Sequence, residues 1–219
     1  MRQVHHIFRR PRTSPQLGMF RMIDPGEEFQ DHLRRGYSYA DQLTPALCRQ
    51  WIDLLNESGE FTAFGSWNET LLEKVILRTL LPEGAVLVLD ARHRVVGCLS
   101  VCSKKSPVAE LMYVLVHQDH RARGLGGAMT RRGLKIAQRN SMAQLRLLTD
   151  SRRWAAVKLY LAHGFLPDLK AGRDCVEKWS QTFEQVFAPA VARPRIIAFP
   201  NLRGINSPGS FGSFQVPPC

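Results

Sequence analysis

The chain of 219 residues lacks any apolar run close to the roughly 20 residues that a membrane span requires. No signal-peptide core follows its basic start either. Cysteine is scarce, with five residues scattered along the chain. An odd, dispersed set of this kind indicates free thiols in a reducing compartment. The sequence therefore predicts a cytoplasmic protein with no membrane partner.

Clustered metal ligands are missing as well. Cys98 and Cys102 lie four residues apart in a strand-like run, but no His or second Cys pair is placed to complete a metal site. A free cysteine packs like a small hydrophobe. We therefore expect both residues to be ordinary strand residues and expect no bound metal.

Acidic residues are absent from both ends of the chain. Residues 1–23 hold five Arg and residues 185–219 hold three, and these account for most of the net charge of +11. We expect a flexible basic arm over 1–18 (or an over-extended start, with Met19 as the initiator), one domain over 19–184, and a Pro/Gly-rich disordered tail over 185–219. Basic ends leave nucleic-acid binding as an alternative, but they lack the interleaved aromatic residues that single-strand binders use.

Hydrophobic periodicity between these ends predicts an α/β fold. The expected helices cover 45–56, a segment opened by a capping box at Ser66 and Glu69 and ended by Pro82, and 125–139. The expected strands cover 20–23, 85–90, 95–103, 109–116 and 145–149.

A glycine-rich turn, RARGLGGA at residues 121–128, is the most informative segment. It joins a strand-like run to a helix-like run. Glycines let a backbone approach a phosphate closely, and the first N–H groups of a helix have no intrahelical partner. Arg121 and Arg123 add positive charge. The segment therefore predicts a phosphate or diphosphate site.

Two familiar phosphate loops do not fit this turn. A P-loop requires Lys-Ser or Lys-Thr after the glycines, and neither is present. A dinucleotide fingerprint requires a third glycine where this chain has Met129, and only Asp150 offers a loose candidate for its ribose-binding acid.

The remaining pattern, R-x-x-G-x-G, resembles the pyrophosphate loop of the GNAT superfamily (GCN5-related N-acetyltransferases). Residues 109–116 (AELMYVLV) and 145–149 (LRLLT) are similar to its fourth and fifth strands, and 154–165 (WAAVKLYLAHGF) to its A-x-x-L-Y-x-x-x-G-F segment. The similarity covers about residues 84–179. The chain departs from it at Gln118, Ala122 and Arg153, where many members carry Pro, Gly and Asn.

The resemblance implies a GNAT fold, a mixed central sheet with splayed middle strands flanked by helices, and acetyl-CoA as co-substrate. A further strand over 174–179 would close this arrangement. It places pantetheine along the backbone of the first splayed strand, and it makes Tyr160 the donor to the departing thiolate. The cofactor-binding residues that it implies are Val114, Leu115, Val116, Arg121, Ala122, Arg123, Gly124, Leu125, Gly126 and Gly127.

Glu110 is the candidate base, because it matches the base glutamate of histone-type members. Strand alternation would place Glu110, Met112, Val114 and Val116 on one face of the sheet, unless a bulge intervenes. Two alternatives stay open: Glu110 is an exposed charge at a strand start, or ordered water deprotonates the amine.

The expected function is therefore transfer of an acetyl group from acetyl-CoA to a primary amine of a small molecule, peptide or protein. A non-catalytic acyl-CoA-binding module is the alternative. The acceptor itself stays open, because the segments that would shape its site, such as the link over 60–67, carry the least motif content. The oligomeric state, including a homodimer, also stays open.

Overall fold

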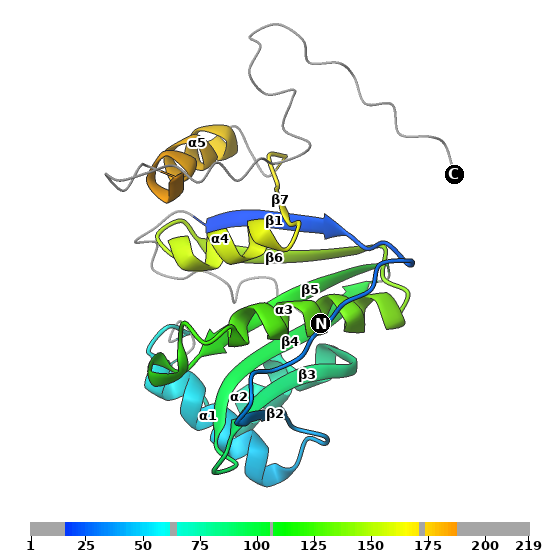
Figure 1. The fold of residues 1–219 in the computed structure, drawn as a ribbon, viewed down its shortest axis with the longest axis vertical. Helices are drawn as coiled ribbons and strands as arrows, with labels where there is room; N and C mark the ends of the chain where they lie inside the picture. The colour runs from blue at the N-terminus through cyan, green and yellow to red at the C-terminus, as the bar shows by residue number, and fades with distance from the viewer. Residues whose placement is uncertain (1–15, 62–64, 106, 171–173, 188–219) are drawn as a thin grey trace, which may run out of the picture. The chain divides into compact units, whose positions relative to one another are not determined.

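A computed structural model describes residues 16–61, 65–105, 107–170 and 174–187 (Figure 1). A division of the chain into two units falls between Val186 and Phe187, and the description below concerns the first unit. Most of the expected arm and most of the expected tail lie outside the described residues.

Seven strands form one sheet in the order β2-β3-β4-β5-β6-β1-β7. They are β1 (Gln16–Met22), β2 (Tyr37–Tyr39), β3 (Leu80–Asp90), β4 (Val95–Lys105), β5 (Val108–Val116), β6 (Gln144–Asp150) and β7 (Leu166–Pro167). Neighbouring strands are antiparallel except β5 and β6. These two are parallel because the chain crosses from one to the other through helix α3 (Leu125–Arg139). The expected α/β class is confirmed.

Helices cover both faces of this sheet. Val86 and Val88 of β3 belong to one core with residues of α3 and α4 (Trp154–Ala162). Leu87 and Leu89 belong to a second core with residues of α1 (Pro45–Ser58) and α2 (Glu69–Val75). Because successive strand residues point to opposite faces, α3 and α1 lie on opposite sides of the sheet.

The second core also contains Cys98 and Cys102, which are buried. Both were expected to be ordinary strand residues, and that expectation is confirmed. Helix α1 begins as its sequence predicts: the Thr44 hydroxyl accepts from the Leu47 N–H at 3.2 Å, and Pro45 is the first helical residue.

The second helix and the strand after it were wrongly delimited. The cap of α2 is Asn68, whose side-chain oxygen accepts from the Leu71 N–H at 2.9 Å, in place of Ser66. The helix ends at Val75, and Pro82 lies inside β3. A proline is tolerated there because the pairing of β3 with β4 jumps from Leu80 to Ala85, so residues 81–84 leave the ladder.

The expected strand over 174–179 is wrong, since these residues begin helix α5 (Asp174–Phe187). The place beside β6 belongs to β1, which runs antiparallel to it from Gln16 to Met22. Leu17 is 1% exposed. The expected arm therefore overlaps the sheet by three residues, and the expected tail overlaps the last turn of α5.

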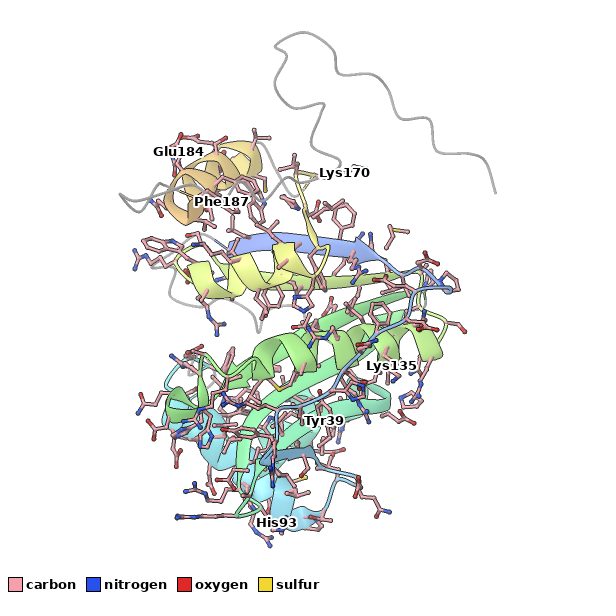
Figure 2. All side chains as sticks on the ribbon, viewed as in Figure 1. Tyr39, His93, Lys135, Lys170, Glu184 and Phe187 are labelled. Carbon is pink, nitrogen blue, oxygen red and sulfur yellow. The ribbon has the colours of Figure 1, made fainter. Side chains whose placement is uncertain are left out.

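The connector from β1 to β2 crosses helix α3 and is bonded to it. Gln138 donates from Nε2 to the carbonyl oxygens of Asp24, Pro25 and Glu27 at 2.7, 3.0 and 2.9 Å. Lys135 and the Tyr39 hydroxyl, both labelled in Figure 2, contact Asp31 at 3.3 and 2.9 Å. The connector therefore fixes α3, whose first turn carries the glycine motif.

Candidate active site

Strands β5 and β6 start together and then separate (Figure 1). Their pairing covers only Val108–Glu110 against Gln144–Arg146. From Leu111 onward, β5 has no partner on its β6 side among the described residues. The expected splay of the middle strands is confirmed, and it leaves a strand edge with backbone groups that an extended ligand can pair with.

A bulge interrupts β5 at the start of this free edge. Between Met112 and Leu115 the strand advances three residues while β4 advances two, from Ser100 to Cys98. Tyr113 takes up the extra residue with φ 52°, and its carbonyl oxygen accepts from the buried Cys98 thiol at 3.3 Å. A bulge re-aims the residues that follow it.

The bulge overturns the face expected from strand alternation. Met112 packs toward the α1 side of the sheet, whereas Val114 and Val116 pack toward the α3 side. Glu110 pairs with Cys102, which lies on the α1 side, so the Glu110 side chain does not share a face with Val114 and Val116. Glu110 is exposed at the last position where β5 and β6 pair.

The glycine turn connects the end of β5 to the first turn of α3. Ala122 and Gly124 have φ of 57° and 80°, and helix α3 begins at Leu125 without a side-chain cap. Ala122 holds a left-handed conformation that costs an alanine about 1 kcal/mol, a cost that the glycine of many GNAT members avoids. A Cβ on Gly124 would meet nothing within 4 Å. The uncapped N–H groups of α3 are therefore arranged to bind an anion.

Two arginines flank the turn. Arg121 donates from Nε to the Val116 carbonyl at 3.1 Å, and Arg123 donates from Nη1 to the Tyr37 hydroxyl at 3.1 Å. Each bond holds one guanidinium nitrogen, and both arginine residues remain exposed. The turn and its two positive charges suit a diphosphate. The Leu125 side chain, in contrast, is buried in the core, so only its backbone can face a ligand.

Tyr160 lies on α4 and is 5% exposed. Its ring packs edge-to-face on Phe165 with centroids 5.7 Å apart. Burial raises the pKa of Tyr160 to about 12, while the nearby charge of Arg153 lowers this pKa and that of Glu60 raises it. The phenol therefore stays protonated at neutral pH and keeps its O–H as a hydrogen-bond donor.

The sequence model of the Acetyltransferase (GNAT) family matches residues 47–165, which is more than half of the chain. This chain belongs to the GNAT family. The match includes β5, the glycine turn and Tyr160. Family membership supports N-acetyltransferase activity in general terms.

Curated relatives agree with this assignment. N-acetyltransferase family 8 member 3 of Rattus norvegicus is 31% identical over 83 residues, and member 7 of Mus musculus is 32% identical over 83 residues. Each alignment covers 36% of this chain, and 36% and 37% of the respective relative. The aligned segment thus spans little more than a third of either protein.

Solved structures show the same fold. A GCN5-related N-acetyltransferase from Sphaerobacter thermophilus superposes with a TM-score of 0.58 at 16% identity, covering 70% of this chain and 48% of that one. Ard1 from Thermoplasma volcanium superposes with a TM-score of 0.53 at 17% identity, covering 64% and 91%. A tandem GNAT protein from the clavulanic acid biosynthesis pathway gives 0.54 at 15% identity, covering 71% and 51%.

Sequence reasoning named the link over 60–67 but did not single out Glu60. It follows α1 and forms ion pairs with Arg121 (Oε1 to Nη2, 3.2 Å) and with Arg153 (Oε2 to Nη2, 2.5 Å). Phe61 lies beside it, with the Arg153 guanidinium 5.8 Å from its ring centroid. No sequence signal points to this cluster, because its members come from three segments more than 30 residues apart.

Tyr37 also belongs to the site without a sequence signal. Its hydroxyl contacts Arg123 at 3.1 Å and His120 Nδ1 at 3.0 Å. Across the described part of the chain, no group of three or more His, Cys, Asp or Glu residues could hold a metal ion. Within the same residues, no helix is both long and apolar enough to span a membrane.

Proposed function

We propose that this protein transfers an acetyl group from acetyl-CoA to a primary amine. The observation that carries the proposal is the combination of a free β5 edge with an uncapped α3 N-terminus at the end of the same strand. An extended pantetheine arm would pair with the backbone of Val114, Leu115 and Val116. The diphosphate would then reach the turn formed by residues 121–127.

Tyr160 is proposed to stabilise the departing thiolate. A phenol with a pKa of about 12 is a weaker acid than a thiol with a pKa near 8.5. It therefore supports the leaving group as a hydrogen-bond donor more than as the source of a fully transferred proton. A hydrogen bond to a charged group contributes about 1.5–3 kcal/mol.

Glu110 is proposed as the base for the incoming amine. It lies on the α1 side of the sheet, at the closed end of the gap between β5 and β6. Leu148, two residues after the β6 partner of Glu110, is 74% exposed. The α1 side of the gap is therefore open, whereas the α3 side is filled by a hydrophobic core. An acceptor amine would approach from the α1 side and reach Glu110 directly or through water.

A cytoplasmic location remains part of the proposal. It rests on the scattered cysteines, of which Cys48, Cys98, Cys102 and Cys175 are free thiols in the structure. The acceptor class remains an amine-bearing small molecule, peptide or protein.

The test begins with calorimetric titration of CoA into the full-length protein. Release of free thiol is then measured with acetyl-CoA and a panel of polyamines, aminoglycosides, amino acids and peptides. Gly126→Asp adds a negative charge at the second residue of α3, where a Cβ would meet only the flexible end of Leu159 at 3.3 Å. We expect CoA affinity to fall by a factor of about 100 or more, with the fold preserved, because a carboxylate then faces a diphosphate.

Gly126→Ala is the matched control, since it adds the Cβ without the charge. Its CoA affinity should stay within about tenfold of the wild type. If both variants bind CoA as the wild type does, the diphosphate does not bind at this turn.

A further inference from the structure

Glu60 connects the two sides of the gap between β5 and β6. Arg121 follows β5, Arg153 follows β6, and the Glu60 carboxylate contacts both. Neither contact lies within a helix or strand pair, so they depend on the tertiary structure alone. Glu60 therefore lies across the open ends of the two strands, on the α1 side from which an acceptor would approach.

The two ion pairs of Glu60 differ in their exposure to water. The pair with Arg153 measures 2.5 Å, and Phe61, which is buried, lies beside the Arg153 guanidinium. The pair with Arg121 measures 3.2 Å, and the Arg121 side chain is 55% exposed against 35% for Arg153. Exposed pairs are weak because water screens them, so Arg121 is the partner that Glu60 loses more readily.

A diphosphate at the glycine turn competes with Glu60 for Arg121. Phosphate oxygens accept bidentate bonds from a guanidinium, and the uncapped N–H groups of α3 add to the pull on the same ligand. The Arg121 side chain is 55% exposed, so it has room to change rotamer and turn its guanidinium from Glu60 toward the glycine turn. The Glu60 Oε1 atom is then left without its guanidinium, while Oε2 stays with Arg153.

We propose that Glu60 is a specificity-determining residue that binds the ammonium group of the acceptor through Oε1 after a CoA diphosphate has drawn Arg121 away. The proposal rests on the CoA-binding function proposed above. It selects acceptors with a positively charged amine near the reacting centre. The displacement of Arg121 thus accompanies CoA binding and at the same time exposes the Glu60 Oε1 atom.

The position of Glu60 relative to Tyr160 supports this assignment. Arg153, which Glu60 contacts, directly precedes helix α4, and α4 carries Tyr160. An ammonium group bound at Glu60 would thus lie close to the residue proposed to face the sulfur. Because Oε2 stays paired to Arg153, the role of the carboxylate is to hold the amine through Oε1 while water takes the proton.

Glu60→Gln tests the proposal, because it keeps the shape but removes the charge that holds Arg121. Glu83→Gln is the matched control, since Glu83 forms an ion pair of the same 3.2 Å length with Arg139, outside the site. The dissociation constant of CoA is measured by calorimetry on each full-length protein. The KM of the amine that the wild type acetylates fastest in the panel above is measured alongside.

We expect the two readouts of Glu60→Gln to change in opposite senses. CoA should bind about threefold more tightly, because Arg121 is no longer held by an exposed ion pair. The KM of the amine should rise about tenfold, because a charge-assisted hydrogen bond to the ammonium is lost. Glu83→Gln should leave both values at the wild-type level.

A misfolded variant would weaken CoA binding as well as amine binding, so it cannot produce the expected split. Unchanged or weaker CoA binding in Glu60→Gln, or an unchanged KM for the amine, overturns the role of Glu60. A wild-type protein that fails to bind CoA instead refutes the proposed function on which this role depends.

Discussion

Replacing Tyr160 by Phe removes one hydroxyl and keeps the ring that packs on Phe165. We expect kcat to fall by about 10- to 150-fold, which corresponds to the 1.5–3 kcal/mol of a hydrogen bond to a charged group. The dissociation constant of CoA should stay within about twofold of the wild type, because the thiolate forms only during the reaction. Steady-state kinetics and CoA calorimetry on the same preparation measure both quantities.

The same variant has a predictable effect on stability at high pH. In the folded protein Tyr160 titrates near pH 12, whereas an unfolded tyrosine titrates near pH 10. Because the folded-state pKa is raised, the stability that Tyr160 contributes is complete below pH 10 and is lost as pH rises toward 12. The slope over this window is about 1.4 kcal/mol per pH unit.

The phenyl ring of the variant has no proton to lose, so Tyr160→Phe should be more stable than the wild type above pH 10 and within about 1 kcal/mol of it at pH 7. Denaturant titrations at pH 7 and pH 11 test this directly. A wild-type kcat in Tyr160→Phe would refute the donor role and leave Tyr160 as a packing residue. If the wild type and Tyr160→Phe lose the same stability between pH 7 and pH 11, the raised pKa of Tyr160 is refuted.

Two substitutions and a pair of deletions test the base, a hairpin carboxylate and the first strand. Glu110→Gln should lower kcat/KM by about 100-fold and change the acid limb of its pH profile while CoA still binds; an unchanged profile would leave ordered water as the base. Asp90 accepts from the Arg94 guanidinium at 2.7 Å and from two backbone N–H groups, and these bonds outweigh burial and lower its pKa to about 2. Asp90→Asn should therefore cost about 2 kcal/mol at pH 7 by urea unfolding, and this difference should disappear as pH falls from 4 to 2 and protonates the wild-type carboxylate. Deleting residues 1–15 should leave the Tm unchanged, whereas deleting 1–22 removes β1 with the buried Leu17 and should abolish cooperative melting; equal Tm values would mean that β1 is dispensable.

Local sequence patterns determined several elements of this protein. The Thr44-Pro45 start of α1, the hairpin of β3 and β4, and the limits of α3 follow from caps, turn residues and periodicity, which act within a few residues of the chain. The glycine turn is readable for the same reason, since a left-handed backbone followed by an uncapped helix needs only neighbouring residues. The family, and with it the splay of β5 and β6, was also recognisable from these motifs.

Tertiary structure decided what the patterns left open. Residues 174–179 form the start of helix α5, and the strand beside β6 is β1, from the other end of the chain. The bulge at Tyr113 arises in the pairing of β5 with β4, where one strand has an extra residue. Alternation along β5 alone therefore predicted one face for Glu110 and Val114, but they lie on opposite faces. Glu60 meets Arg121 and Arg153 only because α1, the glycine turn and α4 converge at the open end of the sheet, and contacts between segments so distant in sequence leave no local trace.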